Sequence, residues 1–201
     1  MTRYAGTEAV IVGAASDIGL AIAKRLVEGG ARVLLAAGTP QEHARLRREL
    51  GPAAQVVDQG ALDAQLARAG GDVDLVFADT VGAARSLAPY LRDGGAVVLT
   101  VPTPATTAPR PAAPSPTAPR SAAALPDAAH ALAAELVGRG IRVNAVAASC
   151  IAAPSGGAVP LPPLGRLGAA EEVARAALFL ATEATFTTGA RLPVDGGLGH
   201  A

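Results

Sequence analysis

The stretch EAVIVGAASDIGLAIA, residues 8–23, decides the fold. A short apolar run opens it, a turn with spaced glycines follows, and a helical pattern of apolar residues completes it. A turn between a strand and a helix can aim free backbone N–H groups and the positive helix end at a pyrophosphate, and glycine lets the phosphate approach closely. We therefore expect a nucleotide-binding turn lined by Gly13, Ser16, Asp17, Ile18 and Gly19.

Three residues of this turn have a second, purely structural interpretation. Gly13 and Gly19 would then serve only the tight turn and the close packing of the helix on the strand. Asp17 would be the helix N-cap and satisfy backbone donors, whereas an Asp17 side chain aimed at a pyrophosphate would repel it. For Asp17 we favour the cap.

The same alternation of an apolar run and a helical stretch continues along the chain. Continuous apolar runs are typical of strands buried on both faces of a parallel sheet. The runs lie at 8–12, 31–37, 53–58, 74–79, 96–101, 142–149 and 190–196, and the helical stretches at 16–30, 40–50, 61–70, 81–95, 126–140 and 169–182. This pattern predicts an α/β fold: a Rossmann-like, doubly wound, mostly parallel sheet of about seven strands with helices on both faces.

Composition narrows the class of protein. The chain has 201 residues, half of them hydrophobic, and no net charge, which predicts a single domain over 1–201. Without a basic surface or many aromatic residues we expect no nucleic-acid or membrane partner, and without a signal pattern or membrane span we expect a cytoplasmic protein. One cysteine and three scattered histidines indicate no metal site.

Residues 102–126 interrupt the alternation. The stretch 101–126 holds eight of the sixteen prolines, and proline removes backbone donors and disfavours helix before it. We predict a Pro/Ala-rich irregular loop, interpreted as a solvated linker; a polyproline ligand for a partner groove is the alternative.

The glycine turn resembles the TGxxxGxG motif of the short-chain dehydrogenase/reductase family, with Val12 in place of Thr and Asp17 in place of the middle glycine. Further similarities are GIRVNAVAA (140–148), the final helix in 163–181 and the last strand and tail in 188–197. The resemblance implies a cofactor site that also includes Gly38, Asp58 and Ala78, with Asp58 at the adenine. It implies NAD or NADP as cofactor, and a dimer or tetramer.

The residues that carry this family's chemistry are absent. The family uses Tyr-x-x-x-Lys to move a proton at the substrate oxygen, yet Lys24 is the only lysine and neither Tyr4 nor Tyr90 has Lys four residues on. Counting back from GIRVN, the Tyr and Lys positions fall on Ala118 and Ala122.

The family's neighbouring motifs at the nicotinamide end of the cofactor site are absent as well. The family's Asn-Asn-Ala-Gly is replaced by Phe77, Ala78, Asp79 and Thr80, and its serine by the region of Pro102, where Thr103 is the nearest hydroxyl. At the end of the second strand, Gly38 and its neighbours show no preference between NAD and NADP.

Three residues remain as weak catalytic candidates: Thr103, Cys150 and His130. For His130 an ordinary helix position is favoured, and for Cys150 a small buried hydrophobe, because no His or Lys lies nearby in sequence to favour the thiolate.

These observations favour a pseudoenzyme, a nucleotide-binding or partner subunit that forms homo-oligomers or assembles with an active family member. Two alternatives stay open. One is an enzyme with non-redox chemistry, such as a lyase, cyclase or isomerase, that recruits Asp79, Thr103, Cys150 or His130 for a small-molecule substrate. The other is an atypical NAD(P)-dependent oxidoreductase with a different acid. The cofactor is then NAD, NADP or none, and the pattern also fits a designed imitation of the family.

Overall fold

The computed structural model describes residues 3–102, 124–152 and 161–198. Strands and helices alternate along these residues as the sequence predicts. The strands are β1 (Glu8–Ile11), β2 (Arg32–Ala37), β3 (Ala54–Asp58), β4 (Val73–Ala78), β5 (Leu91–Pro102), β6 (Arg142–Ala148) and β7 (Arg191–Val194). The helices are α1 (Asp17–Glu28), α2 (Pro40–Leu50), α3 (Leu62–Arg68), α4 (Val81–Leu87), α5 (Ala124–Leu136) and α6 (Ala170–Thr182). Four short 3₁₀ turns join them: η1 (Gly51–Ala53), η2 (Gln59–Ala61), η3 (Ala88–Tyr90) and η4 (Val137–Arg139).

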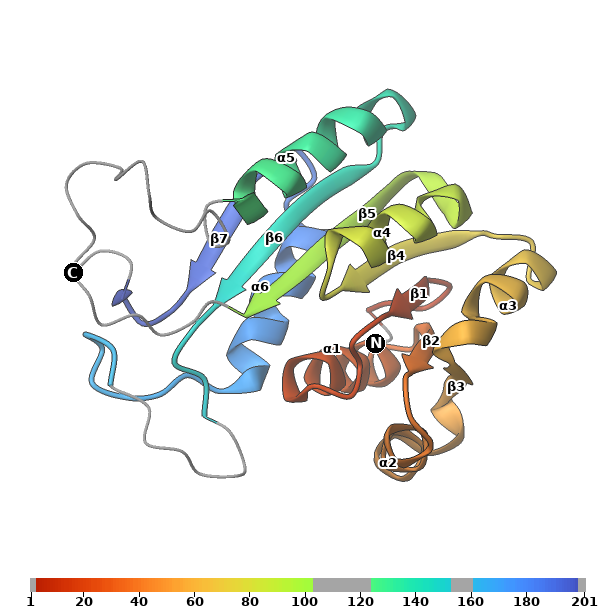
Figure 1. The fold of residues 1–201 in the computed structure, drawn as a ribbon, viewed down its shortest axis with the longest axis horizontal. Helices are drawn as coiled ribbons and strands as arrows, with labels where there is room; N and C mark the ends of the chain where they lie inside the picture. Colours follow the sequence, from red (N-terminus) through yellow and green to blue (C-terminus); the bar gives the residue numbers. More distant parts are fainter. Residues whose placement is uncertain (1–2, 103–123, 153–160, 199–201) are drawn as a thin grey trace.

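The strands form one seven-stranded sheet in the order β3-β2-β1-β4-β5-β6-β7, and every pair is parallel. This confirms the predicted Rossmann-like architecture. The arrowheads of β4, β5, β6 and β7 point to the same edge of the molecule (Figure 1). The chain order reverses between β1 and β4, and in open α/β sheets ligands bind beyond the carboxyl ends of the strands at such a switch point. We call this edge, with the residues that directly follow the strands, the carboxyl edge.

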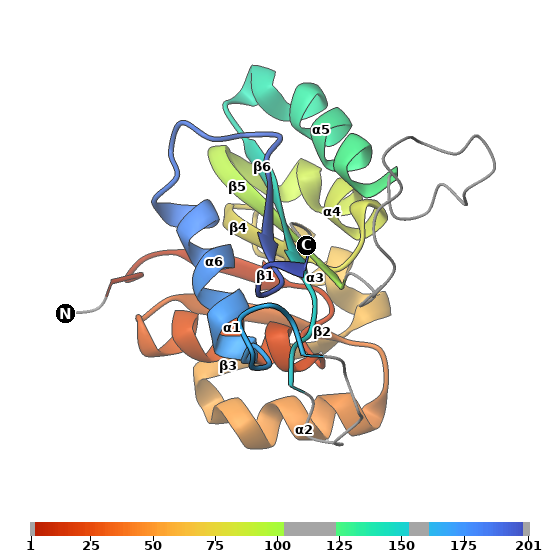
Figure 2. The same ribbon diagram turned by 90° about the vertical axis from the view of Figure 1, so that its left-hand side faces the viewer.

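Two apolar layers bury the faces of the sheet. One cluster combines side chains of α1, α2 and α6 with the strand residues on the face of the sheet that these helices cover. The other combines side chains of α3, α4 and α5 with the strand residues on the opposite face of the sheet. Figure 2 shows α1 and α6 next to each other on one side and α4 and α5 on the other. Leu26 of α1 and Leu132 of α5 are fully buried examples from the two layers. The layers fix the strands rigidly and so determine where their carboxyl ends lie.

The region before β5 differs from the sequence prediction. The helical stretch predicted over 81–95 ends at Leu87, and residues 91–95 belong to the strand. Leu91 pairs with Val73, the register shifts, and pairing resumes at Ala96. A Cβ at Gly95 would come within 2.9 Å of the Asp74 carbonyl oxygen, so glycine here lets the two backbones approach closely at a bulge. The sequence prediction took the two glycines of this segment as the end of a helix.

The bounds of the predicted loop 102–126 were also wrong at both ends. Pro102 is the last residue of β5, where it pairs with Ala148, and α5 begins at Ala124. Residues 103–123 lie outside the described residues.

Side chains satisfy both ends of α6. At its start, the Glu172 carboxylate accepts a hydrogen bond from the Ala169 N–H at 2.9 Å and forms a two-point ion pair with Arg166. These hydrogen bonds, the one from Arg166 foremost, lower the pKa of Glu172 to about 2. At its end, the Arg142 guanidinium donates to carbonyls including those of Leu180 and Ala184, and burial lowers the pKa of Arg142.

Candidate functional site

The turn over residues 12–19, which we call the glycine turn, is built by its own hydrogen bonds. The Ser16 hydroxyl donates to the Gly13 carbonyl at 2.8 Å and accepts from the Gly19 N–H at 3.0 Å. Gly13 has φ +79°, and a Cβ at Gly19 would come within 2.6 Å of the Gly13 carbonyl oxygen. Both glycines are therefore required by the turn itself, as the structural interpretation holds.

The cap assigned to Asp17 was wrong, because Ser16 is the N-cap of α1 and Asp17 is its first helical residue. The Asp17 carboxylate instead pairs with Arg45 of α2 at 2.9 Å. The Arg45 guanidinium also donates to the Ala15 carbonyl at 3.1 Å, so it ties the glycine turn to α2. Both Ser and Asp are good cap residues, and the sequence alone does not separate them when they are adjacent.

The ends of β2 and β3 lie side by side, because Ala37 pairs with Asp58. Asp58 is exposed there, at the position expected from the resemblance. The Gly38 N–H is already used: it donates at 2.8 Å to Glu42 Oε2, which also accepts from Thr39. This capping box is visible in the sequence as Thr39 followed by Glu42, and it is the signal that could have placed a carboxylate at the end of β2.

Asp79 is the residue whose contact with the glycine turn the sequence does not predict. Ala78, the last residue of β4, is fully buried and offers no polar side chain, whereas Asp79 is exposed. The β1–β4 register sets Gly13 beside Asp79, since the Val12 N–H donates to the Phe77 carbonyl at 2.9 Å. A Cβ at Gly13 would come within 2.7 Å of Asp79 Oδ2, so the carboxylate lies directly against the glycine turn.

Neither tyrosine nor the lysine lies at the carboxyl edge. Tyr4 precedes β1 and packs against Gly29, where a Cβ would overlap its ring. Tyr90 ends the turn before β5. Both tyrosines are thus at the amino ends of strands, and Lys24 lies within α1 and pairs with Glu49 of α2 at 2.9 Å.

Of the weak catalytic candidates, His130 and Cys150 are not brought together. Thr103 lies outside the described residues. His130 sits in the middle of α5, with its Nδ1 only 2.9 Å from where a Cβ on Gly189 would be, and Gly189 precedes the amino end of β7. Cys150 follows β6 at the carboxyl edge, is buried, and has φ +53°, the one positive φ of a non-glycine residue among the described residues.

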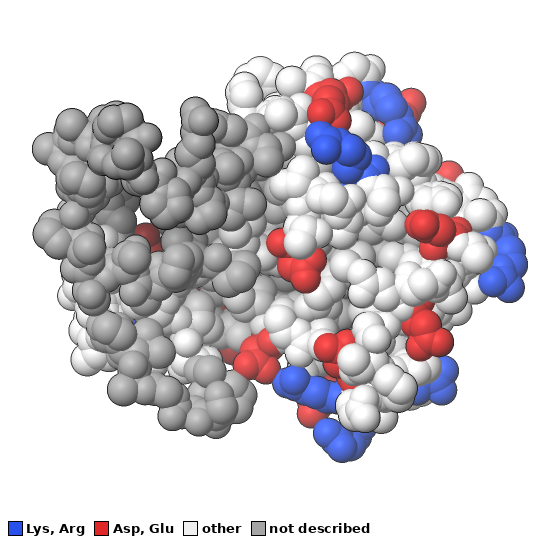
Figure 3. Space-filling model, in the orientation of Figure 1, with Lys and Arg blue, Asp and Glu red and all other residues white. Residues whose placement is uncertain are grey.

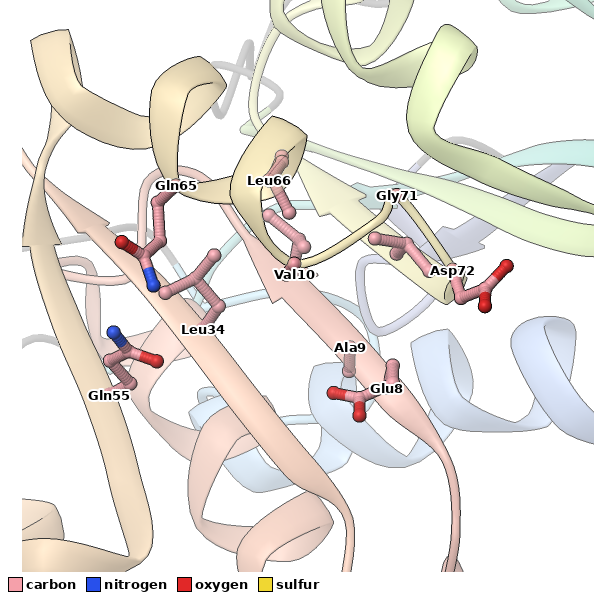
Figure 4. A pocket seen from close by; sticks show the side chains of 11 residues that line it. Glu8, Ala9, Val10, Leu34, Gln55, Gln65, Leu66, Gly71 and Asp72 are labelled. Carbon is pink, nitrogen blue, oxygen red and sulfur yellow. The ribbon is translucent and has the colours of Figure 1, made fainter.

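Two pockets bear on the search for a site. One of about 300 Å³ lies at the ends of β6 and β7 and is lined by residues that include Cys150, Arg166 and Asp195. The other, of about 120 Å³, lies between the sheet and α3, where Val10, Leu34 and Leu66 line it and the Gln65 and Gln55 amides lie on the far side of Leu34 (Figure 4). This second pocket is reached from the amino half of β1 and is separate from the carboxyl edge.

Neither the charge on one face of the molecule nor a group of metal ligands points to a further site in the described residues. On the face seen in Figure 3, acidic and basic side chains lie next to one another over the described residues. Within the described ranges there is no group of three or more His, Cys, Asp or Glu side chains that could hold a metal ion, and no helix long and apolar enough to cross a bilayer.

Known proteins match the chain over most of its length. The family model described as Enoyl-(Acyl carrier protein) reductase matches residues 53–199. Galactitol 2-dehydrogenase (L-tagatose-forming) of Cereibacter sphaeroides is 31% identical over 244 aligned positions, which cover 97% of this chain and 96% of the relative. That alignment is longer than this chain, so part of the relative has no counterpart here.

Solved structures agree. A 3-oxoacyl-(acyl-carrier protein) reductase from Brucella melitensis superposes with a TM-score of 0.77 at 28% identity, covering 100% of this chain and 94% of that one. BdcA in complex with NADPH superposes with a TM-score of 0.73 at 26% identity, covering 96% and 95%. The resemblance found in the sequence is confirmed, and the chain belongs to the short-chain dehydrogenase/reductase family.

Proposed function

We propose that this protein is a non-catalytic member of its family, derived from NAD(P)-dependent oxidoreductases and acting as a binding or partner subunit. One observation carries the proposal: Tyr4, Tyr90 and Lys24, which are all the tyrosines and lysines of the chain, lie away from the carboxyl edge. A reduction of this type needs a positioned acid at the substrate oxygen. Both tyrosines lie at the amino ends of strands, and Lys24, in the middle of α1, is held in an ion pair with Glu49.

The adenosine end of the family's cofactor site is better preserved than the nicotinamide end. Asp58 is exposed at the end of β3, and the Glu42 carboxylate adds an acceptor beside it at the end of β2. Acceptors at these strand ends suit the hydroxyl groups of a ribose and the amino group of an adenine. The Asp79 carboxylate lies against Gly13 of the glycine turn and adds a negative charge beside this end of the site.

We further propose that the chain self-associates through α6 and the segment after it. Two of the three phenylalanines are exposed there: Phe186 completely and Phe179 by 47%. Contiguous exposed apolar side chains mark interaction surfaces, and in this proposal Phe179 and Phe186 belong to one such surface. A homo-oligomer, or an assembly with an active family member through the same surface, would follow.

One observation favours the non-redox alternative. A positive φ at a buried, non-glycine residue is strained, and such residues cluster at functional sites. Cys150 meets this description and lines the pocket at the ends of β6 and β7. If Cys150 is instead a packed hydrophobe, iodoacetamide should label it only at the rate of unfolding; rapid labelling of the folded protein would favour a reactive thiol.

The proposal is tested by hydride transfer. NADH or NADPH is mixed with the protein and a broad panel of aldehydes and ketones, and reduced cofactor is followed by absorbance, with an active family member as positive control. We expect no oxidation above the rate in buffer. Clear turnover that scales with the concentration of this chain would contradict the proposal.

A further inference from the structure

A groove of about 550 Å³, a volume within the range of small-molecule sites, lies at the edge of the sheet opposite the carboxyl edge. We call this edge the amino edge. The groove is formed at the starts of β1, β4, β5 and β6 and beside the end of α6, and β4, β5 and β6 begin on the side away from their arrowheads (Figure 1). The side chains that give the groove its chemistry are Arg92, Arg142, Asp74, Thr7, Thr182 and Thr185. None of them lies at the carboxyl edge, so a ligand here would occupy a second site.

The charges that line the groove do not cancel. Asp74 is the one carboxylate among the lining residues, and both of its oxygens are used. Its Oδ1 pairs with Arg92 at 2.7 Å, and its Oδ2 accepts from the Glu8 N–H at 2.8 Å. Arg142, in contrast, has no carboxylate partner among the described residues. The lining therefore keeps an excess of positive charge, which attracts an anion.

Arg142 is a fixed cation with unused donors. Its side chain donates to the carbonyls of Leu180, Ala181 and Ala184, which uses three of the five N–H groups of a guanidinium. The Nε N–H and one N–H of Nη2 have no partner among the described residues. Burial lowers the pKa of Arg142, and no acidic neighbour raises it again. Because α6 already holds this side chain, little freedom is lost when it binds an oxyanion.

Further donors line the same groove. Arg92 uses two N–H groups, one on Asp74 and one on the Asp72 carbonyl, and its side chain is 49% exposed. The hydroxyls of Thr7 and Thr185 have no hydrogen-bond partner within the described part of the chain. Guanidinium and hydroxyl donors are the groups from which phosphate and carboxylate oxygens accept.

We propose that the amino-edge groove binds a small oxyanion, a molecule whose phosphate or carboxylate group is held by Arg142 and Arg92. The hydroxyls of Thr7 and Thr185 donate to its remaining oxygens. A groove of about 550 Å³ also has room for a polar body beyond the anionic group. The site goes beyond the proposed function, because it contains neither the tyrosines nor the lysine on which that function rests.

The test uses inorganic phosphate and acetate as probes, with chloride at the same ionic strength as the blank. In calorimetric and NMR titrations at least one of them should bind saturably with a Kd of about 5 mM or lower. The largest shifts should fall on the amides of Gly94, Gly140 and Thr185. Whichever probe binds more tightly identifies the anionic group that the site prefers.

Two variants of the groove should weaken this binding. Arg92→Gln removes a charge-assisted donor and should raise the Kd at least about fivefold. Thr185→Asp places a negative charge at an exposed position of the lining and should raise the Kd by a similar factor through repulsion. If Arg92→Gln does not fold, Thr185→Asp provides the test.

The matched control is Arg85→Gln, which removes a similarly exposed arginine from its pair with Glu135 of α5. This variant should change the Kd by less than about twofold, because it acts far from the groove through an exposed pair. No saturation by either anion below about 50 mM, shifts confined to the glycine turn, or equal affinities of the groove variants and the wild type would each overturn the inference. None of these readouts involves turnover, so the proposed function stands or fails separately.

Discussion

The layer of α1, α2 and α6 differs from the carboxyl edge in how its polar groups are partnered. In the layer, side chains complete both ends of α6: Glu172 caps its start, and Arg142 donates to the carbonyls at its other end. At the carboxyl edge, Asp79 has no partner among the described residues and Cys150 has a strained backbone. The comparison teaches that the fold does not depend on the chemistry at its edge, so the chemistry can be lost while the packing is kept.

The start of α1 should lose the most stability when its close backbone packing on the glycine turn is violated. Gly19→Ala places a Cβ 2.6 Å from the Gly13 carbonyl oxygen, and backbone atoms on both sides cannot move away cheaply. We expect a loss of about 3 kcal/mol in the free energy of unfolding, measured by urea denaturation.

The matched control is Gly82→Ala, in the first turn of α4, where nothing lies within 4 Å of an added Cβ. This change should be neutral or stabilise by up to about 1 kcal/mol. Equal effects of the two substitutions would break the comparison.

The capped start of α6 should make stability depend on pH. The pKa of Glu172 is about 2 in the folded protein against an ordinary value of 4.5, so its ionised form is favoured by folding. The contribution is therefore complete above about pH 4.5 and is lost as the pH falls towards 2. Glu172→Gln should lower the melting temperature at pH 7, and the difference from the wild type should shrink steadily between pH 4.5 and 2.

Glu171→Gln is the control for that series, since it removes the same charge from the same helical turn at a residue with no hydrogen-bond or ion-pair partner among the described ones. A difference that persists unchanged at acid pH would show that Glu172 acts through something other than its charge.

The exposed aromatic surface should affect assembly and not folding. Phe186→Asp is expected to shift the protein to a smaller species in sedimentation velocity, with the free energy of unfolding changed by less than about 0.5 kcal/mol. Val137→Asp alters another exposed apolar residue, 57% accessible in η4 directly after α5, and should leave the sedimentation unchanged. Identical sedimentation of Phe186→Asp and the wild type would place self-association elsewhere.

The smallest effect is expected for the only lysine. Lys24→Met breaks an exposed ion pair with Glu49, and exposed pairs contribute little. The urea midpoint should match that of the wild type within error. A large loss of nucleotide binding or of any activity in this variant would contradict its assignment to the layer.

The sequence predicts the sheet and its helices well, because continuous apolar runs and helical spacing depend on short stretches of chain. It fails at residues 91–95, where Asp-Gly-Gly is compatible with both a helix end and a bulged strand and only pairing with β4 decides. It also fails at Asp17, because two adjacent cap residues compete. The contact between Gly13 and Asp79 joins residues far apart in sequence and depends on the β1–β4 register. Local patterns carry no information about it.

Oxidation of NADH and NADPH in the presence of a carbonyl panel, run with the wild type and with Asp79→Asn, tests the central claim most directly. The substitution identifies intrinsic activity, because a contaminating enzyme would not respond to it. We predict that the wild type oxidises neither cofactor above the rate in buffer. Turnover that scales with the concentration of this chain would contradict the account and return the protein to the active members of its family; a change of that turnover in Asp79→Asn would also place it at the carboxyl edge.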